Sequence, residues 1–143
     1  MPKNKKEITK RAQQMNKKEL LSKVWQHLLS IKKGFAFTNQ SKRIYVNCRN
    51  FYNLDLEMYN IDLKCIVLIN LHTGNLKSEE LTKMQKLVEH YNRNVAYSHE
   101  NPTIGILINN YRNRCHITYV GIPDQQKKVV EKTLLLDEFD NDN

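Results

Sequence analysis

Two neighbouring apolar segments carry the side chains with the clearest potential for chemistry. Asp55 and Glu57 stand two residues apart in segment 51–59, and His72 follows segment 65–71. Residues two apart on a strand point to the same face, so both carboxylates are expected on one side of a sheet. Two carboxylates and an imidazole can hold a softer divalent ion such as Mn²⁺ or Zn²⁺, with the histidine as ligand or general base. Asp55, Glu57 and His72 therefore form one candidate metal site.

The same side chains also have structural interpretations. Glu57 alone is typical of a solvated strand residue, and Asp55 could instead hydrogen-bond a neighbouring backbone turn. The three cysteines form no CxxC pair and no Cys/His cluster, which argues against a disulfide framework and a structural zinc site. The chain also has no Gly-rich phosphate loop, nucleophile elbow or Cys/His catalytic signature.

The spacing of apolar residues predicts the elements that must position these side chains. Asn16 followed by Glu19 resembles a capping box and predicts a helix over 17–32, ended by Gly34. Segment 51–59 alternates as a strand does. The other expected elements are strands over 34–40, 43–49, 65–71, 103–109 and 115–121, a polar turn over 109–114, a helix N-capped by Ser78, and a last helix over 123–136.

These elements follow one another in the order α-β-β-β-β-α-β-β-α. Helices at both ends and a strand-helix-strand crossover in the middle indicate an α/β (α+β) fold with a mixed central sheet flanked by helices. A length of 143 residues suits one domain. We expect a basic, disordered lead-in over 1–16, a single domain over 17–136 and an acidic tail over 137–143.

The formal net charge of +8 lies entirely in the first quarter of the chain. Residues 1–33 hold ten Lys or Arg against two Glu, and the remaining residues hold thirteen of each sign. Such a concentration attracts nucleic-acid phosphates without reading sequence, although a solvated lysine-rich lead-in has the same composition. The candidate nucleic-acid contacts are cations of the first helix and of the polar turn: Lys17, Lys18, Lys23, Lys32, Lys33, Arg112 and Arg114.

The sequence also predicts a compartment and a class of partner. No apolar run approaches the ~18 residues that a membrane span needs, and the lysine-rich start has no apolar stretch of a signal peptide. We therefore expect a cytoplasmic protein with no membrane partner. The expected partner is nucleic acid, with DNA favoured, or another protein, and a homodimer is also open.

Short motifs along the chain resemble those of a known nuclease superfamily. They are Asp55, Leu63-Lys64-Cys65, Thr73-Gly74 and the segment NPTIGILI at 101–108. Their order and spacing are similar to the PD-(D/E)xK, or restriction-endonuclease-like, superfamily, and within it to the bacterial nuclease-domain family of the YhcG type. The resemblance covers residues from about 20 to 122 and implies a core of order αβββαβ with additions.

The resemblance also implies roles for three positions. Asp55 takes the place of the metal-binding Asp, Asn70 that of the Glu and His72 that of the Lys in Glu-x-Lys. An amide brings no charge to Mg²⁺, and free imidazole is mostly uncharged at neutral pH, unlike lysine. The implied protein is thus a degenerate nuclease fold that acts as a nucleic-acid-binding or protein-interaction module. No cofactor is expected, and Mg²⁺ or Mn²⁺ is expected only if the site is active.

Two alternatives stay open on the sequence. One is a divalent-metal-dependent DNA endonuclease whose site is rebuilt from Asp55, Glu57 and His72. The other is an oligomerisation scaffold. If the three side chains converge within about 4–5 Å, close enough to share one ion, the rebuilt site gains support.

Overall fold

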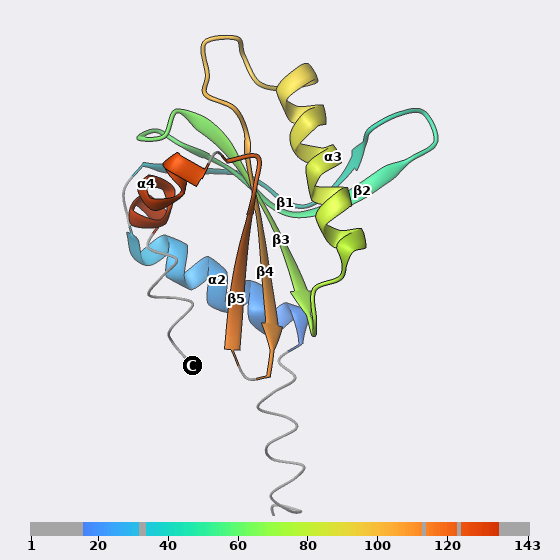
Figure 1. Cartoon of the computed structure of the whole chain (residues 1–143), viewed down its shortest axis with the longest axis vertical. Coiled ribbons are helices and arrows are strands. Elements are labelled where there is room, and N and C mark those ends of the chain that lie inside the picture. The colour runs from blue at the N-terminus through green and yellow to red at the C-terminus, as the bar shows by residue number, and fades with distance from the viewer. Residues whose placement is uncertain (1–15, 32–33, 113, 123, 135–143) are drawn as a thin grey trace, which may run out of the picture.

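The computed structural model describes residues 16–31, 34–112, 114–122 and 124–134. Five strands form one sheet in the order β1-β2-β3-β4-β5 (Figure 1). β3 and β4 are parallel and are joined by a helical crossover, while every other neighbouring pair is antiparallel. The elements are α2 (Lys17–Ile31), β1 (Phe35–Tyr45), β2 (Phe51–Asn60), β3 (Cys65–Thr73), α3 (Ser78–Asn94), β4 (Ile104–Tyr111), β5 (Arg114–Val120) and α4 (Asp124–Leu134).

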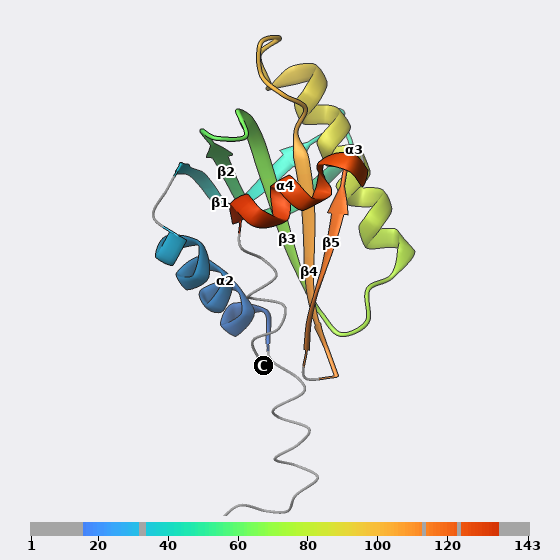
Figure 2. The same cartoon turned by 60° about the vertical axis from the view of Figure 1, so that its left-hand side comes forward.

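Helices cover both faces of this sheet, which confirms the predicted α+β class with a mixed central sheet (Figure 2). On one face, α2 and α4 pack over β2, β3 and β4, and we call this the α2-side core. On the other face α3 packs through Met84, Leu87, Val88 and Tyr91, and we call this the α3-side core. β3 contributes alternate residues to both cores, which explains its almost continuous apolar sequence.

Two strands run further than the sequence predicts, so one expected strand break is absent and the expected polar turn over 109–114 is shorter. The expected strands over 34–40 and 43–49 are joined in one strand, β1, which ends at Tyr45 and leaves residues 46–49 outside it. β1 passes through Ser41 in the left-handed region (φ 53°) and stays paired with β2 on both sides of it. β4 likewise runs on through Asn109 and Asn110, which are buried. The Asn109 amide donates a hydrogen bond to the carbonyl of Gly74 at 3.0 Å, so a polar side chain is satisfied inside the sheet.

The helix starts agree with the sequence in one case and differ in the other. The capping box is present, because the backbone N–H of Glu19 donates to Asn16 Oδ1 at 2.8 Å. Ser78 was predicted as an N-cap and is instead the first residue of α3, after Lys77 at the cap position, which makes no side-chain cap bond. The last helix spans Asp124–Leu134, within the predicted range.

Parts of the predicted domain plan lie outside the described residues. These are the lead-in up to residue 15, Lys32 and Lys33, Pro123, and the acidic tail over 137–143. Among the described residues, no helix is long and apolar enough to cross a membrane.

β1 and β2 extend together beyond the rest of the sheet. β2 pairs with β3 only from Leu56 to Asn60, whereas its pairing with β1 continues outward to Phe51. Residues 42–54 therefore form a two-stranded projection that reaches past α3, and we call it the β-arm (Figure 1).

Candidate functional site

Asp55 stands where β2 separates from β3. The last backbone pair between these strands is Leu56 with Ile69, and a side chain then takes over the strand contacts. The N–H of Asp55 donates to Asn70 Oδ1 at 2.8 Å, and Asn70 Nδ2 donates to the carbonyl of Asn53 at 3.1 Å. The Asn70 amide thus bridges the point where β2 separates from β3, which we call the fork. Its oxygen accepts a hydrogen bond from a backbone N–H.

Both carboxylate oxygens of Asp55 are engaged by the protein. Oδ2 accepts a hydrogen bond from the N–H of Leu71 at 2.8 Å, and Oδ1 lies 3.0 Å from Nζ of Lys17, at the start of α2. The Asp55 residue is only 8% exposed, while the Lys17 side chain is 55% exposed. Lys17 was predicted to contact nucleic acid, and here its ammonium supplies the cation beside Asp55.

Glu57 belongs to a different environment. Its Oε2 accepts a short hydrogen bond from the Tyr91 hydroxyl of α3, and its Oε1 accepts from Asn39 Nδ2 at 2.7 Å and Thr38 Oγ1 at 2.8 Å. Burial alone raises the pKa of Glu57, but these hydrogen bonds and the charge of Lys42 outweigh it and hold that pKa below its usual value. Glu57 is therefore a carboxylate that fastens α3 to β1 and β2.

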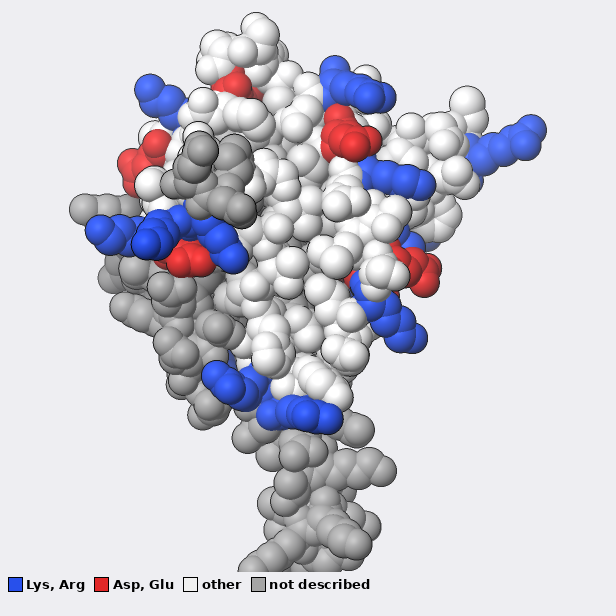
Figure 3. All heavy atoms as spheres, in the orientation of Figure 1, with Lys and Arg blue, Asp and Glu red and all other residues white. Residues whose placement is uncertain are grey.

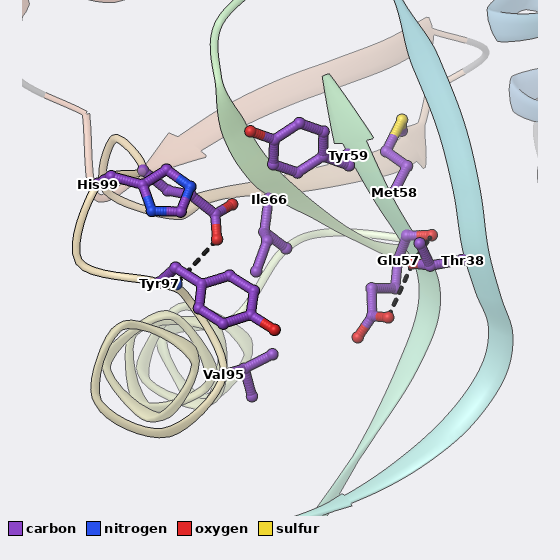
Figure 4. Close-up of a pocket in the computed structure, with 9 residues that line it drawn as sticks. Thr38, Glu57, Met58, Tyr59, Ile66, Val95, Tyr97 and His99 are labelled. Carbon is purple, nitrogen blue, oxygen red and sulfur yellow. Dashed lines mark hydrogen bonds between the residues drawn. The ribbon is translucent and has the colours of Figure 1, made fainter. Parts of the chain in front are cut away.

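A cavity of about 490 Å³ opens beside Glu57 (Figure 4). Figure 4 shows Glu57 on the strand wall and Tyr97 on the opposite wall, with Val95 on the same side as Tyr97. Asp55 does not line this cavity.

A break in strand alternation separates Asp55 from Glu57. Leu54 packs in the α3-side core and Leu56 in the α2-side core, although residues two apart on a regular strand share a face. Asp55 meets Lys17 on the α2 side, so alternation is interrupted between Asp55 and Leu56. The expectation that Asp55 and Glu57 share a face is thus wrong, and the cause is this interruption at the fork.

His72 is turned toward α3 and the loop before it. Its Nε2 lies 3.1 Å from the carbonyl of Asn75, and its Nδ1 lies 3.9 Å from Glu80 Oε1. Both ring nitrogens therefore face other partners than Asp55. Within the described ranges, no three His, Cys, Asp or Glu side chains gather so that they could hold a metal ion. The structure does not bring Asp55, Glu57 and His72 together.

The donor set at Asp55 does not fit the divalent-metal site that the sequence resemblance implies. In the part of the chain that the structure describes, Asp55 joins no group of three His, Cys, Asp or Glu side chains that could hold a metal ion, and both of its oxygens are engaged. The neighbouring amide oxygen of Asn70 already accepts a hydrogen bond from the Asp55 N–H and carries no charge. Hard cations such as Mg²⁺ choose several anionic or neutral oxygen ligands that are free to turn toward them.

The predicted basic contacts on α2 have different surroundings. Lys18 is exposed, and Lys23 is half-buried on the same helix. Lys32 and Lys33 lie outside the described residues.

Two predicted arginines lie at the turn between β4 and β5. Arg112 and Arg114 are both exposed, and the Arg112 guanidinium lies 5.1 Å from the ring centre of Tyr111. The start of α2, the end of β3 and this turn all lie at the same end of the sheet (Figures 1 and 2). Figure 3 shows basic side chains at this end. The arginines are therefore on the same side of the molecule as the Asp55 fork.

The β-arm carries basic and aromatic side chains that are not among the sequence-predicted site residues. Its three cations are Lys42, Arg43 and Arg49, and residues 42–54 contain no Asp or Glu. Tyr45 and Phe51 on the same arm are exposed. The local absence of acidic residues beside aromatic ones is the signal in the sequence that points to this surface.

Comparisons with known proteins agree with this architecture. The YhcG PDDEXK nuclease domain model matches residues 5–138. The putative nuclease YhcG of Escherichia coli (strain K12) is 21% identical over 107 residues, which are 73% of this chain and 28% of that protein.

A solved structure shows the same fold at lower identity. A repair endonuclease from Pyrococcus abyssi superposes with a TM-score of 0.50 and 18% identity, over 82% of this chain and 43% of that chain. The fold is thus restriction-endonuclease-like. This chain spans less than half the length of either relative. Because the family model matches nearly the whole sequence, the chain belongs to the YhcG PDDEXK nuclease domain family.

Proposed function

We propose that this nuclease-fold domain binds nucleic acid without cleaving it. The observation that carries the proposal is the state of Asp55, whose two carboxylate oxygens are held by Lys17 and by the Leu71 N–H. Phosphodiester cleavage in this family requires a cation that polarises the phosphate and helps to generate hydroxide. Here the Lys17 ammonium neutralises the Asp55 carboxylate instead. An ammonium can attract a phosphate, but it cannot activate water as a metal ion does.

The residues at the neighbouring positions, Asn70 and His72, also argue against cleavage. Asn70 and His72 stand where the family has Glu and Lys, and both are occupied with other partners. A rebuilt site has less support, because Glu57 is bonded to Tyr91 on the other face of the sheet. Loss of the catalytic groups leaves the fold and its charged surface available for binding.

The charge of the chain favours nucleic acid over a protein as the partner. The formal net charge is +8, and the exposed cations Lys18, Arg112 and Arg114 lie at the same end of the molecule as the fork. Contacts of Lys and Arg with phosphates release counterions from the nucleic acid, and this term drives non-specific binding. We therefore expect affinity that depends strongly on salt and weakly on sequence.

The first test is a titration of single- and double-stranded DNA and RNA by fluorescence anisotropy at low and at moderate salt. We expect a dissociation constant in the micromolar range at low salt that rises steeply with salt, since each phosphate contact contributes about 0.7–0.9 to the slope of log K against log salt. The double variant Arg112→Ala/Arg114→Ala should bind more weakly, with a slope smaller by about 1.5.

Lys128→Ala is the matched control, because it removes an exposed cation from α4. It should leave affinity and slope close to those of the wild type. A wild-type chain with no affinity for any of the four ligands at low salt would remove nucleic-acid binding from the account and leave a protein partner.

A further inference from the structure

The β-arm carries positive charge and contains no acidic residue of its own. Lys42, Arg43 and Arg49 are all exposed, and no Asp or Glu occurs in residues 42–54. Figure 3 shows basic side chains at the far end of this projection. A surface of this kind attracts phosphates, and its projection from the sheet lets it reach a strand that passes the domain.

The arm also exposes a cluster of planar side chains. Tyr45 and Phe51 face each other across β1 and β2, with ring centres 5.5 Å apart, and they are 55% and 40% exposed. The Arg43 guanidinium lies over the Phe51 ring at 4.3 Å from its centre. Exposed aromatic rings beside arginine are the surfaces on which unpaired bases stack.

This cluster lies on the same face of β2 as the fork. Phe51, Asn53 and Asp55 are two residues apart in turn, and the residues between them, Tyr52 and Leu54, pack in the α3-side core. A strand rises about 3.3 Å per residue, so Phe51 is roughly 13 Å along β2 from Asp55. A nucleic-acid strand on the cluster could therefore continue toward Asp55 and Lys17.

We propose that Arg43, Tyr45 and Phe51 form a stacking platform for the bases of a single-stranded nucleic acid. This inference rests on the proposed function and names the surface and the class of ligand. A single strand is favoured over a duplex because duplex bases already stack on one another and offer no free faces to the rings. Arg43 holds the Phe51 ring and, with Arg49, attracts the phosphates.

The experiment measures the affinity of the full chain for a fluorescent single-stranded oligonucleotide and for the matching duplex. Phe51→Leu and Tyr45→Leu keep apolar bulk but remove the stacking faces, and each should weaken single-strand binding by roughly 5- to 100-fold. Their salt slopes should equal that of the wild type, since no charge is lost. Phe51→Trp should bind at least as tightly as wild type.

Two further variants test the contribution of charge on the β-arm and the effect of removing an exposed ring elsewhere. Arg49→Ala should reduce the salt slope by about 0.7. Tyr97→Leu removes another exposed ring, 71% exposed and outside the arm, and should leave the affinity unchanged. A thermal unfolding scan of each variant confirms that it is folded.

The outcomes separate this inference from the proposed function. If the wild type binds and both leucine variants bind equally well, the platform is wrong and nucleic-acid binding stands. The single-strand assignment is wrong if the leucine variants lose duplex and single-strand affinity alike. If the wild type binds no nucleic acid, both proposals fail together.

Discussion

Replacing Lys17 with Ala and Asn70 with Glu should give the chain a measurable affinity for Mn²⁺. Lys17→Ala frees Asp55 Oδ1, which now lies 3.0 Å from the ammonium. Asn70→Glu adds a second carboxylate beside Asp55 that can still accept the hydrogen bond of the Asp55 N–H. Two carboxylates should bind with a dissociation constant of about 0.1–1 mM, the weak end of carboxylate sites. Isothermal titration calorimetry of the double variant and the wild type measures the difference.

The matched control is Lys17→Ala/Asn70→Gln, which has the same size and lacks the added charge. It should bind Mn²⁺ no better than the wild type, and adding Asp55→Ala to the Glu variant should abolish the affinity. The explanation of the fork fails if the wild type already binds Mn²⁺ as tightly as the Glu variant. It also fails if the Gln and Glu variants cannot be distinguished.

Glu57→Ala should lower the free energy of unfolding by about 3 kcal/mol, because it leaves the Tyr91 hydroxyl buried without its charged acceptor. Tyr91 is 1% exposed, so its hydroxyl relies on this acceptor in the folded chain. The double variant Glu57→Ala/Tyr91→Phe should recover part of the loss, since both polar partners are then gone. Urea denaturation at neutral pH gives these values. A loss under about 0.5 kcal/mol would show that Glu57 does not fasten α3 to the sheet.

Lowering the pH should remove the contribution of Glu57 to the free energy of unfolding. Because the folded-state pKa of Glu57 is lowered, the unfolded chain binds its proton more readily than the folded chain. The stabilisation is thus fully present above the ordinary pKa of Glu, about 4.3, and is lost as the pH falls through the lowered folded-state value. The difference in free energy of unfolding between the wild type and Glu57→Gln should therefore decrease as the pH falls through that range. It should stay constant from pH 6 to pH 8.

The sequence was sufficient for most of the fold because each core element has its own local pattern. The apolar run of β3, the stripe of α3 and the capping box at Asn16 all predict their elements from neighbouring residues. The two strand errors arose where polar residues are satisfied by contacts far along the chain. Asn109, for example, is held by the carbonyl of Gly74, which no local pattern predicts.

The candidate site was less predictable. Asp55 was placed correctly on a central strand, but its face relative to Glu57 was not, because alternation fails where β2 leaves β3. The partner of Asp55 comes from Lys17, thirty-eight positions earlier, and depends on how α2 crosses the sheet. Such long-range contacts require the tertiary structure.

A nuclease assay tests most directly whether the domain binds nucleic acid without cleaving it. Plasmid, single-stranded DNA and RNA are incubated with the wild type and with Asp55→Ala, each in Mg²⁺ and in Mn²⁺. We predict that all substrates stay intact in every reaction, although the wild type retains its affinity for them. Cleavage by the wild type that needs metal and disappears in Asp55→Ala would contradict the account and restore this fork as a working nuclease site.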